Sequence, residues 1–200
     1  PHPRKPHMFL WVQISPSDDW FVVDEGKCAE DCTETYKEVD RIEAEFGLVI
    51  AQRLMDPNMA LSPSRQRRDV NWQDEFSGAG LACDLGMDSE VGRKRINTML
   101  KPDPDTERPR LIIHPRCKDT IYQLQRYSWD DFSKRVDKDQ KQLAKAKHDD
   151  YPTLLKYLAN FCQRLSYKKK PSTVKNLSQE MTKRKMYLKD LKMIPIFVWV

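Results

Sequence analysis

The sequence has few cysteines, and their arrangement argues against two common roles. The five cysteines are odd in number and scattered, at Cys28, Cys32, Cys83, Cys117 and Cys162. With no recognisable signal peptide, we expect no disulfide framework, and a reducing cytosol is the default compartment. No second Cys or His pair follows Cys28 and Cys32 at the spacing of a zinc finger, so we expect no structural zinc.

Long apolar runs and phosphate loops are also missing. No run approaches the roughly 18 apolar residues of a membrane span, so we expect a soluble protein without membrane contact. No Gly-x-x-x-x-Gly-Lys-Ser/Thr segment occurs, so this chain is not itself a P-loop ATPase. With 200 residues and 39% hydrophobic content, the chain can bury a core, and its length suggests one domain plus an appendage.

Positive charge exceeds negative charge slightly and is gathered in clusters. Lys and Arg number 35 against 30 Asp and Glu, which favours anionic partners without establishing one. Each cluster alone is typical of a solvated surface, but two of them flank the acidic segments described next. A site that cuts a polyanion needs such charge to hold phosphates. The candidate phosphate-binding residues are Arg65, Arg67, Arg68, Lys145 and Lys147.

The first acidic segment is Met55-Asp56-Pro57-Asn58. It follows residues 46–54, an aliphatic and β-branched run that predicts a largely buried strand. Asp56 is therefore expected where a strand leaves the core. An Asp before a Pro is also an ordinary turn signal, and this alternative remains open.

The second acidic segment is His148-Asp149-Asp150. The apolar spacing of the residues that follow predicts a helix over about 150–165, with both carboxylates in its first turn, where the helix dipole favours negative charge. An ordinary helix cap is the alternative. His148 is a candidate metal ligand or general base, or only a neighbour of that cap. Asp24, at a strand end, is a further candidate or a solvent-facing turn residue.

Carboxylates on two rigid elements suit divalent metal chemistry. Mg²⁺ takes oxygen ligands, and two ions about 3.5–4 Å apart can clamp the attacking and leaving oxygens of a phosphodiester. Asp56, Asp149 and Asp150 are the predicted catalytic and metal-binding residues.

Periodicity predicts strands and helices in alternation after an initial hairpin. We expect strands at 8–14, 20–24, 46–54, 81–85 and 111–114, and helices at 30–46, 72–78, 88–100, 120–127 and 150–165. Residues 57–70 should form a loop, and residues 129–147 are strongly charged. This order implies an α/β fold with a mixed sheet.

The last 35 residues form the expected appendage, a basic tail over 166–200. It contains a predicted helix at about 174–191 and the apolar segment 194–200. That segment is suited to adding a strand to a partner. Alternatively, it packs as an edge element on its own domain.

Four segments together resemble the nuclease domain of the large terminase subunit of tailed bacteriophages. They are Asp56-Pro57-Asn58-Met59, Trp72-Gln73-Asp74-Glu75-Phe76, the stretch from Ile96 to Pro104, and Leu111-Ile112-Ile113-His114-Pro115-Arg116-Cys117. The resemblance covers about residues 1–165. It implies a ribonuclease H-like domain, a mixed sheet flanked by helices, that cuts concatemeric viral DNA during packaging with Mg²⁺ or Mn²⁺.

The same resemblance implies site residues and partners. Asp56 is similar to the second acidic ligand of the family, and Asp149 and Asp150 to its C-terminal acidic pair. The implied partners are double-stranded DNA, an ATPase domain preceding this one in the polypeptide, the portal and the small terminase subunit. It also implies a location in the host cytoplasm, transiently at the procapsid, and we expect the isolated domain to be a monomer.

Two departures from the family pattern matter for activity. Pro1-His2-Pro3-Arg4 resembles the turn that follows the first strand of the family, so that strand and its catalytic Asp are missing from this chain. Thr153 stands where an acidic residue is common. Two further hypotheses therefore stay open: a non-cleaving DNA-binding or docking module, and another ribonuclease H-like nuclease such as a junction resolvase.

Overall fold

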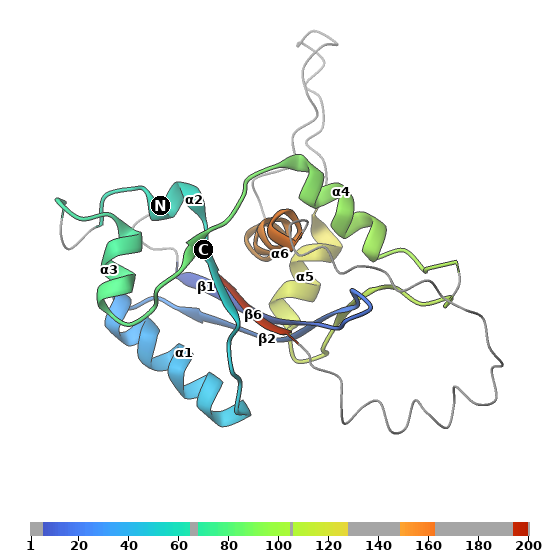
Figure 1. Cartoon of the computed structure of the whole chain (residues 1–200), viewed down its shortest axis with the longest axis horizontal. Coiled ribbons are helices and arrows are strands. Elements are labelled where there is room, and N and C mark those ends of the chain that lie inside the picture. The colour runs from blue at the N-terminus through green and yellow to red at the C-terminus, as the bar shows by residue number, and fades with distance from the viewer. Residues whose placement is uncertain (1–5, 65–67, 105, 128–148, 163–193, 200) are drawn as a thin grey trace, which may run out of the picture.

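The computed structural model describes residues 6–64, 68–104, 106–127, 149–162 and 194–199. The chain forms a mixed α/β structure around one six-stranded sheet, in the order β4-β3-β6-β1-β2-β5 (Figure 1). The strands are β1 His7–Ile14, β2 Trp20–Cys28, β3 Gln52–Met55, β4 Asp84–Leu85, β5 Leu111–Ile113 and β6 Ile194–Trp199. The described helices are α1 Cys32–Phe46, α2 Pro57–Ala60, α3 Trp72–Gly78, α4 Glu90–Met99, α5 Lys118–Arg126 and α6 Asp150–Phe161.

The sheet contains two groups of parallel strands, which lie on either side of one antiparallel strand, β1. β1 and β2 form the predicted antiparallel hairpin, and β5 runs parallel to β2 at one edge. At the other edge, β4, β3 and β6 run parallel to one another. β1 lies between β6 and β2 and is antiparallel to both, so it joins the two groups. The α/β class and the mixed sheet predicted from the sequence are confirmed.

Helices cover both faces of this sheet (Figure 1). Because side chains alternate along a strand, neighbouring residues of β1 enter different cores. Phe9 and Trp11 join a core with α1 and α3, whereas Leu10 and Val12 join a core with α6. All four side chains are at most 1% exposed. The buried sheet thus separates two apolar layers.

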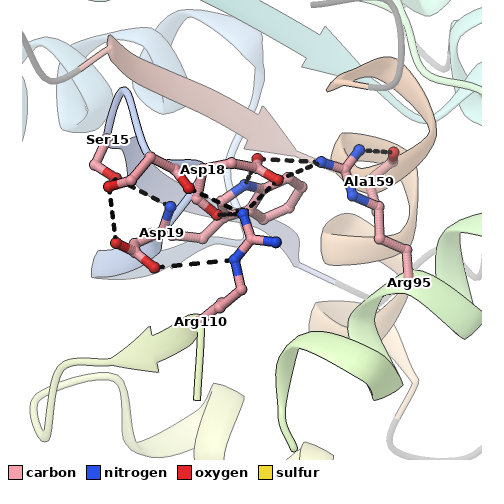
Figure 2. Close-up of polar contacts among 8 residues, drawn as sticks. Ser15, Asp18, Asp19, Arg95, Arg110 and Ala159 are labelled. Atoms are coloured by element: carbon pink, nitrogen blue, oxygen red, sulfur yellow. Dashed lines mark hydrogen bonds and ion pairs between the residues drawn. The ribbon is translucent and has the colours of Figure 1, made fainter. Parts of the chain in front are cut away.

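The turn between β1 and β2 is tied to the α6 side of the molecule through one carboxylate (Figure 2). Asp18 adopts a left-handed backbone with φ of 64° and accepts hydrogen bonds from two arginines. Arg95 of α4 also donates to the Ala159 carbonyl of α6 at 3.2 Å. Arg110, just before β5, also donates to the Asp18 carbonyl at 2.9 Å. The turn is therefore linked to α4 and to the start of β5 directly, and to α6 through Arg95.

Several predicted elements are shorter than expected. The strand predicted over 46–54 begins only at Gln52, and Val49 is 83% exposed. Gly47 explains this difference, because its left-handed cap ends α1 and the chain must then cross the surface before it re-enters the sheet. The predicted strand 81–85 is reduced to β4, and the predicted loop 57–70 begins with the short helix α2.

The C-terminal segment differs most from expectation. It adds a strand to its own sheet, but in the centre and not at an edge. Residues 194–199 therefore share one sheet with the predicted nuclease domain and are not a separate appendage. The predicted helix 174–191 and the charged stretch 129–147 lie outside the described residues. In the described part of the chain, no helix is both long and apolar enough to cross a membrane.

Candidate functional site

Asp56 lies where β3 ends, as the sequence predicts. Its Oδ1 accepts a hydrogen bond from the backbone N–H of Asn58 at 2.8 Å, so the carboxylate caps α2. Pro57 occupies the first turn of this helix, where its missing N–H costs nothing. The cap fixes the side chain in a half-buried position at the end of the strand.

Asp88 follows β4 and lies at the end of the sheet where β3 and β4 finish. β3 and β4 are parallel, with Met55 opposite Leu85, so their carboxyl ends lie side by side. The Gly86 N–H continues this pairing by donating to the Met55 carbonyl at 2.7 Å. A Cβ on Gly86 would lie 3.0 Å from the Cβ of Tyr157 and 3.1 Å from that carbonyl oxygen. The absent side chain lets the segment leading to Asp88 pass close to α6.

Asn160 of α6 holds the segment that carries Asp88. Its Nδ2 donates to the Met87 carbonyl at 2.7 Å and to the Ser89 carbonyl at 2.9 Å, the residues on either side of Asp88. One turn earlier on the same helix face, Lys156 Nζ lies 2.5 Å from Asp88 Oδ1. α6 therefore binds both the backbone and the side chain of this segment.

Tyr157 is a buried phenol of α6 whose pKa is raised by burial and by nearby carboxylates. The residue is 2% exposed, and burial is the main cause that raises the pKa of its hydroxyl above the ordinary value. The negative charges of Asp56 and Asp88, a hydrogen bond to Asp56 and the charge of Asp149 raise this pKa further. Asp56 is thus the carboxylate that acts most strongly on this phenol, and Asp88 and Asp149 act on it in the same direction.

The two neighbouring carboxylates at the start of α6 raise the pKa of different tyrosines. Asp149 is the residue before the helix, and its charge raises the pKa of Tyr157. It also raises the pKa of Tyr127, for which burial is the larger cause. Asp150 instead acts on Tyr151, whose pKa is raised mainly by burial and then by the charge of Glu25.

Asp24 lies apart from this group. It is on β2, and β2 is separated from β3 by β1 and β6, which corresponds to about 14 Å across the sheet. The Asp24 carboxylate is 3.7 Å from Arg116 Nη1. The structure therefore does not bring Asp24 to the edge occupied by Asp56.

One of the predicted phosphate-binding residues can be placed. Arg68 is exposed in the loop between α2 and α3. This loop is closed by hydrogen bonds from Ser64 N to the Val70 carbonyl at 2.8 Å and from Trp72 N to the Ser62 carbonyl at 3.1 Å. The other predicted phosphate-binding residues lie outside the described part of the chain: Arg65, Arg67, Lys145 and Lys147. The candidate metal ligand or general base His148 also lies outside it.

Sequence reasoning missed three members of this site: Asp88, Lys156 and Tyr157. The sequence did carry a signal for Asp88. Carboxylates that follow two neighbouring parallel strands are expected side by side, and Asp88 follows β4 as Asp56 follows β3. Lys156 and Tyr157 carried no such signal, since both belong to an ordinary amphipathic helix pattern.

A divalent metal needs several ligand side chains around one point. Among the described residues, no three side chains of His, Cys, Asp or Glu lie together as a group that could hold a metal ion. The described residues by themselves therefore do not form the predicted two-ion centre. The charged partner of Asp88 is the ammonium of Lys156.

Comparisons of the chain with protein-family models, curated proteins and solved structures give no match. The functional assignment therefore rests on the sequence and on the geometry described above.

Proposed function

We propose that this domain cuts double-stranded DNA as the nuclease of a phage packaging machine, through a ribonuclease H-like arrangement of carboxylates. The arrangement that supports this most is at the carboxyl ends of β3 and β4: Asp56 follows β3, and Asp88, after the parallel strand β4, pairs with Lys156 of α6. The charges of Asp56 and of Asp149, at the start of α6, both raise the pKa of the Tyr157 hydroxyl. They are 93 positions apart in the sequence, and Asp88 joins them from β4. Carboxylates gathered at strand ends and a helix start suit hydrolysis of a phosphodiester.

The position of β6 is relevant to the strand that the resemblance marks as missing. A strand joined to β1 by a short turn before His7 would run antiparallel to β1. It would have to use the edge of β1 that faces β3, because β2 occupies the other edge. β6 runs in this direction and fills this position. Its residues Ile194–Trp199 include no carboxylate.

The chemistry assigned to this chain is therefore limited to what its side chains can do. A carboxylate at this edge can accept the proton of an attacking water, and Arg68 in the adjacent exposed loop can contact a phosphate. Phosphate contacts carry no base information, so we expect little sequence preference and strong salt dependence. The requirement for Mg²⁺ or Mn²⁺ remains a prediction of the resemblance.

A second candidate function is a DNA-binding or docking module that does not cleave. Two observations favour it: the described residues contain no three-residue metal group, and the strand between β1 and β3 supplies no acidic ligand. A site short of ligands binds a divalent ion weakly. Under this alternative, DNA binding would persist without cutting.

Plasmid nicking separates the two candidates. The full chain is incubated with supercoiled plasmid and Mn²⁺, Mg²⁺ or EDTA, beside Asp56→Asn and Asp149→Asn variants. Metal-dependent nicking by the unmodified chain that is lost in both variants supports the nuclease. DNA binding in a gel-shift assay with no nicking under any metal supports the module instead.

A further inference from the structure

Asp56 and Asp88 follow closely on one backbone hydrogen bond that joins the ends of β3 and β4. The Gly86 N–H donates to the Met55 carbonyl at 2.7 Å. Asp56 is the residue after Met55, and Asp88 is the second residue after Gly86. Because consecutive Cα atoms are only about 3.8 Å apart, both residues stay at this end of the sheet. The position of Asp88 there depends on what holds the segment 86–89.

Asn160 of α6 holds this segment on both sides of Asp88. Its Nδ2 donates to the Met87 carbonyl at 2.7 Å and to the Ser89 carbonyl at 2.9 Å. Asn160 is only 4% exposed, and a buried amide is retained where its hydrogen bonds are made. With the carbonyls before and after it both bound by one amide, the backbone of Asp88 has little freedom to move.

The position of Asn160 is itself fixed by α4. A Cβ on Gly92 would lie 2.8 Å from Asn160 Cγ and Nδ2, so only a glycine leaves room for the amide at this point. The segment also leads directly into α4, because Ser89 Oγ accepts a hydrogen bond from the Val91 N–H at 3.3 Å and caps that helix. The segment is therefore held between α6, which binds it, and α4, which it starts.

We propose that Asn160 is a positioning residue of the candidate site, which acts on DNA cleavage by holding Asp88 at the ends of β3 and β4. The side chain of Asp88 is 46% exposed and can meet a phosphodiester, whereas Asn160 is too buried to reach one. Asn160 therefore influences cleavage only through Asp88. This inference rests on the proposed function, because it needs a cleavage reaction on which to act.

A double-mutant cycle on plasmid nicking by the full chain with Mn²⁺ tests this. It compares the unmodified chain, Asn160→Ala, Asp88→Asn and the double variant. We expect Asn160→Ala to lower kcat about tenfold or more with little change in KM, because a displaced carboxylate stabilises the transition state less well. In the Asp88→Asn background, the same replacement should cost less than about twofold, since the carboxylate that Asn160 positions is already gone.

An asparagine that only stabilises the fold would give a different result. Its replacement would lower kcat by the same factor in both backgrounds, and that outcome would overturn the proposal, as would full nicking by Asp88→Asn. The matched control is Thr120→Ala. Thr120 is also buried, and its Oγ1 donates to Glu25 Oε2 at 2.6 Å, on β2. This variant should lower the thermal midpoint but keep kcat within about twofold of the unmodified chain.

The remaining outcomes also decide the question. If Asp88→Asn shows no nicking, the kcat of Asn160→Ala is compared with that of Thr120→Ala, and equal values would overturn the positioning role. If Asn160→Ala does not fold, Asn160→Ser, which keeps one hydrogen-bond donor, takes its place. Nicking by the unmodified chain with equal losses in both backgrounds overturns the positioning role alone. No nicking by the unmodified chain overturns the proposed function, and this inference with it.

Discussion

Arg110 Nη2 donates a hydrogen bond to Asp18 Oδ2 at 2.8 Å across 92 positions of sequence (Figure 2). The contact joins the β1–β2 turn to the start of β5 at the far end of the sheet from Asp56. Both side chains are about one-third exposed or less, so solvent screens the pair only partly. A second arginine, Arg95, shares the carboxylate at 3.1 Å.

We expect replacement of Asp18 to lower stability in two steps. Asp18→Asn tolerates the left-handed backbone but removes the charge, which should cost about 1–2 kcal/mol given the hydrogen bonds to two arginines. Asp18→Ala adds backbone strain of about 1 kcal/mol at φ of 64°. Urea unfolding followed by circular dichroism measures both. The control is Asp19→Asn, because the Asp19 carboxylate lies 4.0 Å from Arg110 Nε. Equal midpoints for Asp18→Asn and Asp18→Ala would refute the backbone contribution.

The divided acidic pair gives a prediction about activity. If the domain is a nuclease, Asp149→Asn should lose plasmid nicking, whereas Asp150→Asn should keep most of it. The reason is that Asp149 acts on Tyr157 together with Asp56, and Asp150 acts on Tyr151. Because the two residues are adjacent and both replacements are isosteric, each serves as a control for the other. Equal loss in both variants would contradict the division.

Alkaline pH should destabilise the fold through its buried tyrosines. The pKa values of Tyr151 and Tyr157 are raised in the folded state, mainly by burial, whereas an unfolded tyrosine titrates near about 10. A raised pKa stabilises the folded state fully below the unfolded value. This stabilisation is lost as the pH rises above about 10, since the unfolded chain then releases protons more readily.

The thermal midpoint measured from pH 8 to pH 11 checks this expectation. The two tyrosines should leave the midpoint unchanged up to about pH 10 and should lower it at higher pH. In Tyr157→Phe, which removes one of the two hydroxyls, the fall should be shallower. An absorbance titration that showed both phenols ionising near their ordinary value in the folded protein would disprove the argument.

Removing β6 should unfold the sheet. β6 pairs with β1 on one side and with β3 on the other, and the backbone groups of a central strand have no solvent to replace their partners. A chain ending at Met193 should therefore lose its cooperative thermal transition. A chain lacking only Val200, which lies past the end of β6, is the control. A truncated chain with an unchanged melting temperature would show that β6 is dispensable.

The local elements were predicted best. The spacing of Tyr36, Val39 and Ile42 predicts α1, and the turn residues from Ser15 to Asp19 predict the hairpin of β1 and β2. Both are confirmed, because they depend on interactions between residues close in sequence. Strand lengths were predicted less well, since residues 46–54 are apolar enough for a strand but only the last few find a partner.

The sequence by itself determined the α/β class, every described helix except α2, and the presence of carboxylates at the end of β3 and the start of α6. Tertiary structure decided which of them share an environment: Asp88 follows a strand that pairs in parallel with β3, and Asp149 and Asp150 act on different tyrosines. It also decided that the C-terminal segment is central in the sheet. The physical reason is that strand pairing and the charge around a buried group depend on residues far apart in sequence, which no local pattern records.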